Sequence, residues 1–348
     1  MFGTAQETGI RTAGRASLRR AAKYAIASSV TAGVVLSVAA TAAPVAQAAT
    51  GPAAATSPAK ATARIQALLD SPASGTVNLP HGTFAISRTL HLRQGERIVG
   101  HGTTLRIASG TGDYDAMLTG TSTATDLSGL TITGVTFDQN TSGNPISNTA
   151  RLFKGAPRFV LLVGSGTGVT ITNDKFVGSD NLNTIVTGGG THNVTISGNV
   201  FRTSNAKIHD HSTIYTSGTG TVIKNNTFAG RALVDSAAIE VHGSKASITG
   251  NHVHGYYKAA NIVASDTTFT GNHVSAAANP VDLWSVAPGG LRNVTVTGNV
   301  LNRDLPRWAT ILRNLGGTLP AAQFTQQVTK DAHSTQGFHN IKVHGNKG

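Results

Sequence analysis

One short motif recurs along this chain, and its spacing constrains the fold more than any other feature. From about residue 130 onward, a β-rich segment with alternating apolar residues returns about every 25 residues, each time followed by Gly or Asn. The copies read LTITGVTF, VTITNDKF, VTISGNVF, VIKNNTF, SITGNHV, TFTGNHV, VTVTGNV and IKVHGN. Periods of 20 to 50 residues are typical of solenoids, and short strands between tight turns predict a β-solenoid.

A right-handed parallel β-helix is the all-β fold that stacks such copies in register. Each copy would pair with the copies one coil before and after it, so that alternating apolar residues form columns inside the helix. Asn after each strand tolerates left-handed backbone, and its amide can bond to the equivalent amide one coil away. The expected core column is Ile171, Ile196, Ile223, Ile248, Phe269 and Val296, and the expected Asn ladder is Asn173, Asn199, Asn226, Asn251, Asn272 and Asn299.

The composition agrees with this fold and excludes several other classes. Gly is abundant at 40 residues, whereas charged residues make up only 13%, which is low for a helical bundle. The absence of Cys excludes disulfide frameworks and thiolate metal sites. The sequence contains no zinc finger, basic helix or RNP-like stretch, so no nucleic-acid partner is expected. The repeats specify no oligomeric state.

The N-terminal residues have the pattern of an export signal. A basic stretch ends at Lys23, an apolar run rich in Ala, Ser and Thr follows, and Ala46-Gln47-Ala48 supplies a small-residue cleavage site. The apolar run approaches the length that spans a bilayer, so an uncleaved membrane anchor is the alternative. We expect a signal peptide at 1–49, a linker at 50–60 and a β-helix domain at 61–348, in a secreted protein without membrane contact after cleavage.

Two segments outside the repeats are expected to cover the helix. Ile65, Leu68 and Leu69 are spaced along one face of a short helix at 64–69, which would cap the N-terminal end of the solenoid. Residues 303–336 break the period and predict a covering loop or a short helix.

A second set of strands lies in the other half of each coil. We align 183–187, 212–216, 237–241, 260–264 and 280–284, which gives an inward column of Ile185, Ile214, Ile239, Ile262 and Leu283. Strict alternation then predicts two outward columns. The first is Val186, Tyr215, Glu240, Val263 and Trp284, and the second is Thr184, Thr213, Ala238, Asn261 and Asp282.

Polar and aromatic residues concentrate on this second set of strands, in the combination that suits a sugar-binding groove. Aromatic rings present large flat apolar faces to sugar rings, and carboxylates accept hydrogen bonds from hydroxyls. Glu is disfavoured in strands, so Glu240 between apolar neighbours favours a function. The candidate catalytic residues are Glu240, Asp210, His211, Lys245 and Asp235, and the candidate substrate-binding residues are Tyr215, Lys258, His242, Asn261, Trp284 and Asp282.

Each candidate also has a structural interpretation. Glu240 would otherwise be a solvated strand residue, and Asp210 and Asp235 would be turn residues. Tyr215 and Trp284 would pack against a covering loop. The alignment puts Asp282 two coils and two residues from Glu240, at ~11 Å, which is too far for a two-carboxylate glycosidase pair.

Metal binding is weakly indicated, so no cofactor is assigned. His209 and His211 lack a third ligand at a readable spacing. Calcium held by Asp210, Glu240 and a carbonyl is the one cofactor that the pattern leaves open, because oxygen ligands of adjacent coils would converge.

With its repeats, Asn ladder and N-terminal cap, the chain resembles the pectate lyase-like superfamily of right-handed β-helix proteins. The stretch GTVNLPHGTFAISRTLHL followed by GHGTTLRI looks like the N-terminal part of such proteins. The resemblance covers about residues 61–348 and implies an extracellular protein that acts on polysaccharide. EVHGSKASITGN is similar to the alginate and chondroitin lyase pattern, which implies a calcium-binding role for Glu240 and a base role for Lys245.

These observations predict an extracellular enzyme that cleaves a polysaccharide, with β-elimination of a uronate polymer as the leading chemistry. Lys245, Lys258 or a His would be the base. A formal net charge of +12, of which about +8 would remain after loss of the leader, favours an acidic substrate. One alternative is hydrolysis, or glycosyl or fructosyl transfer, on a neutral glycan by Glu240 with Asp210 or Asp235. The other is a non-catalytic solenoid that binds cell wall or glycan.

Overall fold

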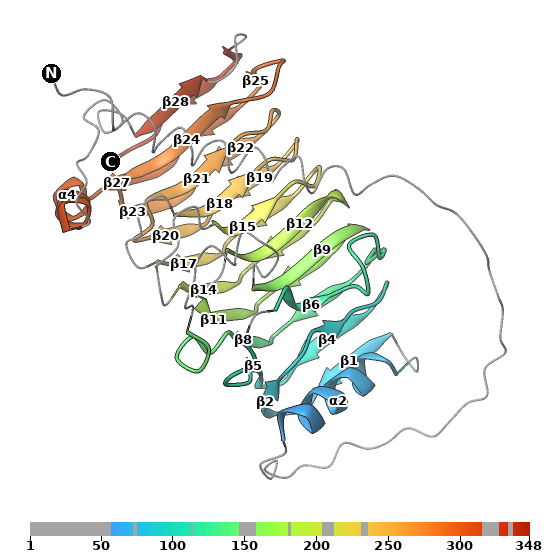
Figure 1. Cartoon of the computed structure of the whole chain (residues 1–348). Coiled ribbons are helices and arrows are strands. Elements are labelled where there is room, and N and C mark those ends of the chain that lie inside the picture. Colours follow the sequence, from blue (N-terminus) through green and yellow to red (C-terminus); the bar gives the residue numbers. More distant parts are fainter. Residues whose placement is uncertain are drawn as a thin grey trace, which may run out of the picture.

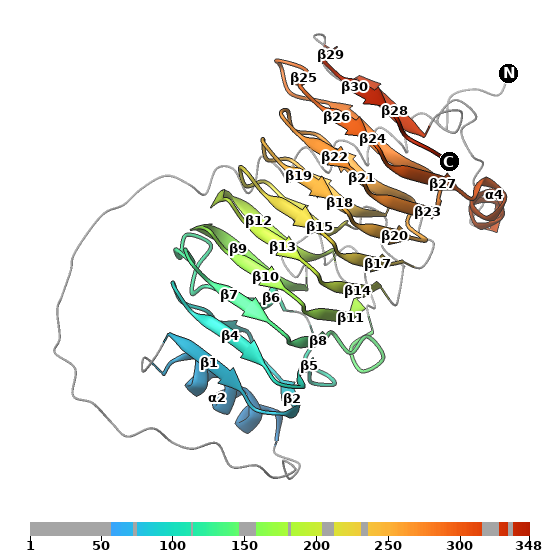
Figure 2. The same cartoon turned by 180° about the vertical axis from the view of Figure 1, so that it is seen from behind.

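The computed structural model describes residues 57–71, 75–112, 114–145, 158–179, 182–203, 212–230, 236–314, 327–332 and 337–348. These residues form three long parallel sheets whose strands follow one another around every coil. Figures 1 and 2 show the coils stacked along one axis, from the blue N-terminal end to the red C-terminal end. The expected right-handed parallel β-helix is confirmed.

Sheet A contains the repeat motif and lies towards the viewer in Figure 2. Its register matches Ile171 with Ile196, and the rest of the expected core column follows in the same way. Its strands are β1 (Thr76–Leu79), β4 (Arg97–Gly100), β7 (Thr131–Thr133), β10 (Thr170–Thr172), β13 (Thr195–Ser197), β16 (Val222–Lys224), β19 (Ser247–Thr249), β22 (Thr268–Thr270), β26 (Thr295–Thr297) and β30 (Lys342–His344).

Sheet B follows sheet A after a tight turn. Its strands are β2 (Gly82–Ile86), β5 (Thr103–Ile107), β8 (Thr136–Asp138), β11 (Lys175–Ser179), β14 (Val200–Thr203), β17 (Thr227–Ala229), β20 (His252–His254), β23 (His273–Ala277) and β27 (Val300–Arg303).

Sheet C closes each coil. Its strands are β3 (Leu90–His91), β6 (Ala116–Thr119), β9 (Phe159–Thr167), β12 (Asn183–His192), β15 (Ser212–Thr216), β18 (Ala237–Val241), β21 (Lys258–Ile262), β24 (Asn279–Ser285) and β28 (Val328–Ala332). The short strands β25 (Leu291–Arg292) and β29 (Phe338–His339) pair beside it.

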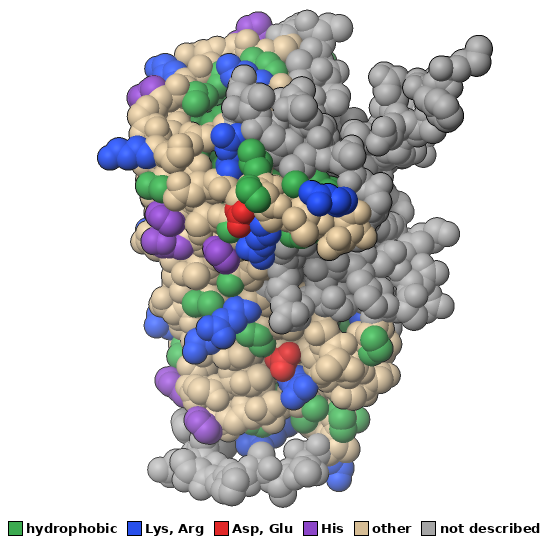
Figure 3. Space-filling model, turned by 90° about the vertical axis from the view of Figure 1, so that its left-hand side faces the viewer, with side chains coloured by type: hydrophobic (Ala, Val, Ile, Leu, Met, Phe, Trp, Pro, Cys, Tyr) green, Lys and Arg blue, Asp and Glu red, His purple; other side chains and the backbone are tan. Residues whose placement is uncertain are grey.

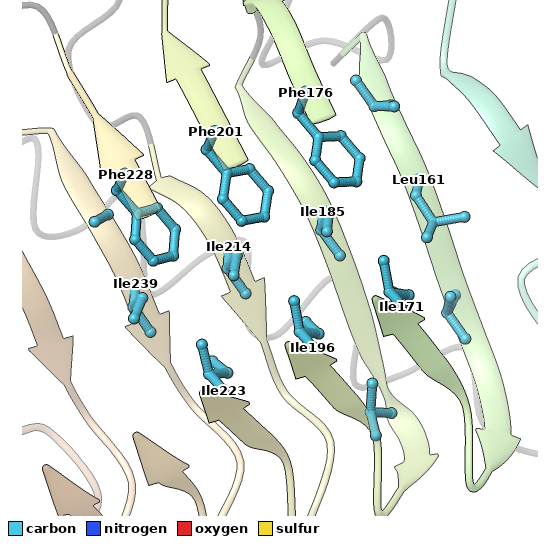
Figure 4. Close-up of a cluster of buried hydrophobic side chains, with 14 of the residues drawn as sticks. Leu161, Ile171, Phe176, Ile185, Ile196, Phe201, Ile214, Ile223, Phe228 and Ile239 are labelled. Carbon is cyan, nitrogen blue, oxygen red and sulfur yellow. The ribbon is translucent and has the colours of Figure 1, made fainter. Parts of the chain in front are cut away.

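The core consists of stacked columns, one or more from each sheet (Figure 4). Sheet B contributes a stack of Phe rings, in which Phe176, Phe201 and Phe228 have ring centroids 4.8 Å apart. That distance equals the spacing between paired strands, so each ring packs flat on the ring of the next coil. Sheets A and C face this stack with columns of Ile.

The turn between sheets A and B contains the predicted Asn ladder, with one correction. The amide of each ladder residue donates to the side-chain oxygen of the next, from Asn199 to Asn346. Asn173 is not a member: it has φ +57° in the position that glycine occupies one coil later, and Asp174 takes the ladder position. In this coil the sequence alignment was shifted by one residue, because Asp174 was not recognised as the equivalent of Asn.

The N-terminal end of the β-helix is covered by a short helix, as expected, but this helix begins earlier than predicted. The N-terminal helix α2 (Pro58–Leu69) buries Ile65 and Leu69 against the first coil, but begins at Pro58, inside the predicted linker. Pro is well suited to the first turn because its fixed φ is helical and its missing N–H would have no partner there. The predicted signal peptide lies outside the described residues. Among the residues described, no helix is long and apolar enough to cross a membrane.

The aperiodic segment after β27 contains the short helix α4 (Leu305–Asn314), one of its two expected forms. Its Trp308 is fully buried, packs edge-on against Tyr257 at 5.3 Å and donates from Nε1 to the Ala276 carbonyl at 3.0 Å.

Trp308→Phe keeps most of the ring contact and removes the hydrogen bond. We expect a loss of about 1–2 kcal/mol in the free energy of unfolding, measured by urea denaturation. An unchanged midpoint would show that the indole N–H does not fix α4.

Candidate functional site

The predicted site lies on the outer face of sheet C, the sheet towards the viewer in Figure 1. Tyr215 on β15 lies opposite Glu240 on β18, as expected. The same column continues through Asn261 and Asp282 to Thr329 on β28. Because paired strands are ~4.8 Å apart, these side chains form one continuous row, which we call the sheet C row.

The order of residues in this row corrects the sequence alignment. Asn261 and Asp282 lie in the column of Glu240, where Val263 and Trp284 were expected. The two carboxylates are therefore two strands apart with no offset along the strand, at about 10 Å rather than ~11 Å between Cα atoms. The core column of Ile239 continues through Ala260 and Val281, not through Ile262 and Leu283.

The alignment was wrong because these strands do not alternate strictly. Two consecutive residues face the core in each: Ala238 and Ile239 on β18, and Ala259 and Ala260 on β21. The predicted outward positions Thr184, Thr213 and Ala238 are completely buried, and the Thr213 hydroxyl lies 2.7 Å from that of Tyr256. The two small Ala residues of β21 gave no apolar signal that would have fixed its register.

Glu240 is a buried carboxylate with two side-chain partners. Only 5% of the residue is exposed. One oxygen accepts a hydrogen bond from the Ser212 hydroxyl, and the other lies 2.9 Å from Nε2 of His242. Burial acts to raise the pKa of Glu240, but the hydrogen bonds from His242 and Ser212 and the charges of His242 and Lys258 outweigh it and lower the pKa below its usual value. Glu240 is therefore ionised at neutral pH.

Asp282 forms a second buried polar group two strands away. Nζ of Lys258 lies 2.9 Å from its Oδ2, and both side chains are less than a tenth exposed. Trp284 Nε1 and the Thr329 hydroxyl each donate to Asp282 at 2.7 Å. The Lys258 ammonium also lies 5.0 Å from the centroid of the Trp284 ring, a cation–π distance.

Two amide oxygens near these groups have no hydrogen-bond partner among the described residues. They are Oδ1 of Asn261, whose residue is 6% exposed, and Oδ1 of Asn279, whose residue is 4% exposed. Asn261 lies between Glu240 and Asp282 in the sheet C row, and Asn279 pairs with Lys258 in the next column. A buried acceptor without a donor costs about 1–3 kcal/mol, so both oxygens are suited to a donor from outside the described residues.

The aromatic candidates border the polar cluster. Tyr215 is 8% exposed and ends an apolar patch with Leu162 and Val186 of the neighbouring strands, rather than packing there on a covering loop. On its other side the Tyr215 ring stacks on His242 at 4.8 Å. His242, Trp284 and Thr329 have intermediate exposure, in contrast to the buried Glu240 and Asp282.

Of the remaining candidates, the structure describes only Lys245, which is not part of this cluster. Lys245 is exposed, with φ +61°, in the turn between β18 and β19, at the position that Gly220 and Asp266 fill in the neighbouring coils. Asp210, His211 and Asp235, together with His209, lie outside the described residues.

The described residues do not fit a calcium ion. Both oxygens of Glu240 already have partners, and the Lys258 ammonium contributes a positive charge nearby. No cluster of three or more His, Asp or Glu side chains suited to a metal occurs in the part of the chain that is described.

Sequence reasoning missed three residues of this cluster. Ser212 and Asn279 occupy the outward column that also contains Lys258, and Thr329 extends the sheet C row. The first two could have been found by applying the register of β18 to the neighbouring strands. Thr329 could not, because the segment before it breaks the repeat.

Comparison with known proteins supports the fold. No protein-family model and no curated protein matches the sequence. Among solved structures, a double mutant of the tailspike protein of E. coli bacteriophage HK620 in complex with pentasaccharide matches with a TM-score of 0.60 and 18% identity, over 72% of this chain and 48% of that chain. The HK620 tailspike protein in complex with pentasaccharide matches with a TM-score of 0.55 and 18% identity, over 69% and 45%. This chain thus spans about half the length of these tailspike chains or less, and at this identity the likeness establishes the β-helix fold alone.

Proposed function

We propose that this protein binds a polysaccharide on the outer face of sheet C and cleaves it there by β-elimination beside a uronate. The observation that carries the proposal is the pair of buried oxygens on Asn261 and Asn279 that lack a hydrogen-bond partner among the described residues and lie beside the buried acids Glu240 and Asp282. Sugar hydroxyls are donors that fill such acceptors. Apolar ring surface from Trp284 beside polar groups is the usual composition of a small-molecule site.

Elimination needs a base and a cation, and the cluster offers both. The imidazole of His242 is the base that the cluster offers. Lys258 is the cation nearest the sheet C row, and the strongly positive chain attracts an acidic polymer. The pentasaccharide bound to the HK620 tailspike supports a glycan ligand for this fold. The predicted signal peptide favours an extracellular site of action.

A glycan panel tests the function directly. The chain is incubated with pectate, alginate, chondroitin and neutral polysaccharides, and products are followed by the absorbance of unsaturated uronate and by reducing ends. New absorbance supports elimination. Reducing ends without absorbance would replace elimination by hydrolysis, although the Cα separation of about 10 Å between Glu240 and Asp282 lies just beyond the ~9.5 Å upper limit for the two carboxyl groups of inverting enzymes.

Non-catalytic binding is the second candidate, because every carboxylate oxygen of Glu240 and Asp282 already has a partner. Trp308→Phe leaves Trp284 as the one Trp of the chain, and its emission is expected to change when glycan binds. Changed emission without any product would establish binding alone. No change with any glycan would refute both functions.

A further inference from the structure

The sequence left the base of the elimination open among Lys245, Lys258 and a His, and the structure pairs one such His, His242, with Glu240. Resting on the proposed function, we infer that His242 is the group that touches substrate and removes the proton, and that Glu240 is a positioning residue that holds the imidazole in its basic tautomer.

The hydrogen bond between His242 and Glu240 determines which ring nitrogen of His242 carries the proton. An ionised carboxylate only accepts, so the imidazole nitrogen that faces Glu240 at 2.9 Å, Nε2, carries the proton. In the neutral ring Nδ1 then carries the free electron pair. None of the described residues gives Nδ1 a hydrogen-bond partner, so this electron pair is available to a ligand.

The orientation of the ring is also fixed. Ser212 donates to the other oxygen of Glu240, which anchors the carboxylate from β15. The Tyr215 ring stacks on the imidazole with an interplanar angle of 29°. The imidazole is therefore held at its edge by Glu240 and on one face by Tyr215, as a preorganised base requires.

The exposed fractions of the two side chains agree with His242 as the base and Glu240 as the positioning residue. The Glu240 side chain is 7% exposed and the His242 side chain 12%, and both oxygens of Glu240 are occupied. Each oxygen of Glu240 accepts one hydrogen bond, so Ser212 and His242 together hold the carboxylate in place. His242 reaches the ligand while Glu240 stays behind it, which is the division of labour in carboxylate–imidazole dyads.

In the reaction, Nδ1 of His242 takes the C5 proton of the uronate. The electrons of that C–H bond form the C4–C5 double bond, the C4–O bond breaks, and the leaving oxygen takes a proton from water. Glu240 balances the charge of the imidazolium that forms. The other titratable groups around this ring are Tyr215 on β15, Lys258 on β21 and Asp282 on β24.

Chemical rescue distinguishes a base from a structural residue. His242→Ala is expected to lower kcat by about 100-fold or more, with partial recovery when imidazole is added. Glu240→Gln is expected to lower kcat about as much, with little change in KM and no recovery with imidazole, because the ring is present but its proton is no longer fixed. His254→Gln, an exposed His on the outer face of sheet B, is the matched control and should leave kcat unchanged. Figure 3 views that side of the molecule, where His side chains gather.

A tautomer measurement keeps the inference testable without turnover. Nitrogen-15 NMR of the neutral His242 ring should place the proton on Nε2 in the parent chain and give a mixture of tautomers in Glu240→Gln. A proton on Nδ1 in the parent chain, or full activity of His242→Ala, would overturn the dyad. Absence of turnover on every glycan with the proton on Nε2 would instead reject the proposed function and leave the dyad standing.

Discussion

Asp174→Asn is expected to stabilise the β-helix by about 4 kcal/mol at pH 7. Asp174 occupies the ladder position before Asn199 and is 1% exposed. Its Oδ1 accepts from the Val135 N–H at 2.8 Å, whereas Oδ2 has no partner. Burial raises the pKa of this carboxyl from 3.8 to about 8, against the lowering effect of backbone hydrogen bonds from Val135 and Thr172.

The sign of the pH dependence follows from proton binding. Between about pH 4 and pH 8 the folded chain holds a proton on Asp174 that the unfolded chain has released, so the free energy of unfolding falls as pH rises. At pH 7 the pH lies about three units above the unfolded-state pKa of 3.8. Each unit contributes about 1.4 kcal/mol, which gives the expected stabilisation of about 4 kcal/mol. Asn cannot ionise, and its Nδ2 would donate to the Asn199 oxygen as every later ladder amide donates to the next.

Urea denaturation at pH 5 and pH 8 measures this effect. The gain from Asp174→Asn should be larger at pH 8 than at pH 5. Asn199→Asp is the matched reverse change and should destabilise the chain, more so at the higher pH. Equal stability of the parent and Asp174→Asn at pH 8 would mean that burial of the Asp174 carboxyl does not destabilise the fold.

The same ladder shows how far sequence could predict this fold. The repeat fixed the register of sheet A because Ile, Phe or Val recurs at each core position and a turn with Asn or Gly ends each strand. Sheet B followed from the same turns. Asp174 was missed because only its surroundings, not its residue type, identify it as the member that continues the ladder.

The site was only partly predictable. Tyr215 and Glu240 were placed side by side because β15 and β18 both carry Ile at the core position. On β21 the core positions are Ala259 and Ala260, so the alignment moved to the next Ile and displaced Asn261 from its true column. Hydrogen bonds and the partners of each carboxylate depend on side-chain positions across four coils, which no repeat pattern specifies.

Lys258→Met is expected to destabilise the chain by about 3–5 kcal/mol. The substitution leaves the Asp282 carboxylate buried with the neutral donors of Trp284 and Thr329 and without its ammonium partner at 2.9 Å. Removal of one member of a buried ion pair has this cost, because the remaining charge is desolvated without compensation. The midpoint of urea denaturation at pH 7 measures it.

The double variant Lys258→Met with Asp282→Asn decides whether the ion pair is the cause. Asn is similar in shape to Asp and keeps an acceptor for Trp284 while removing the charge, so the double variant should recover most of the lost stability. Additive losses in the two single variants would mean that Lys258 stabilises the coil through its contacts with other groups, such as the Trp284 ring. If the double variant recovers its stability but no longer binds glycan, the charges of Lys258 and Asp282 serve ligand recognition. Stability and binding would then have been separated at the same two positions.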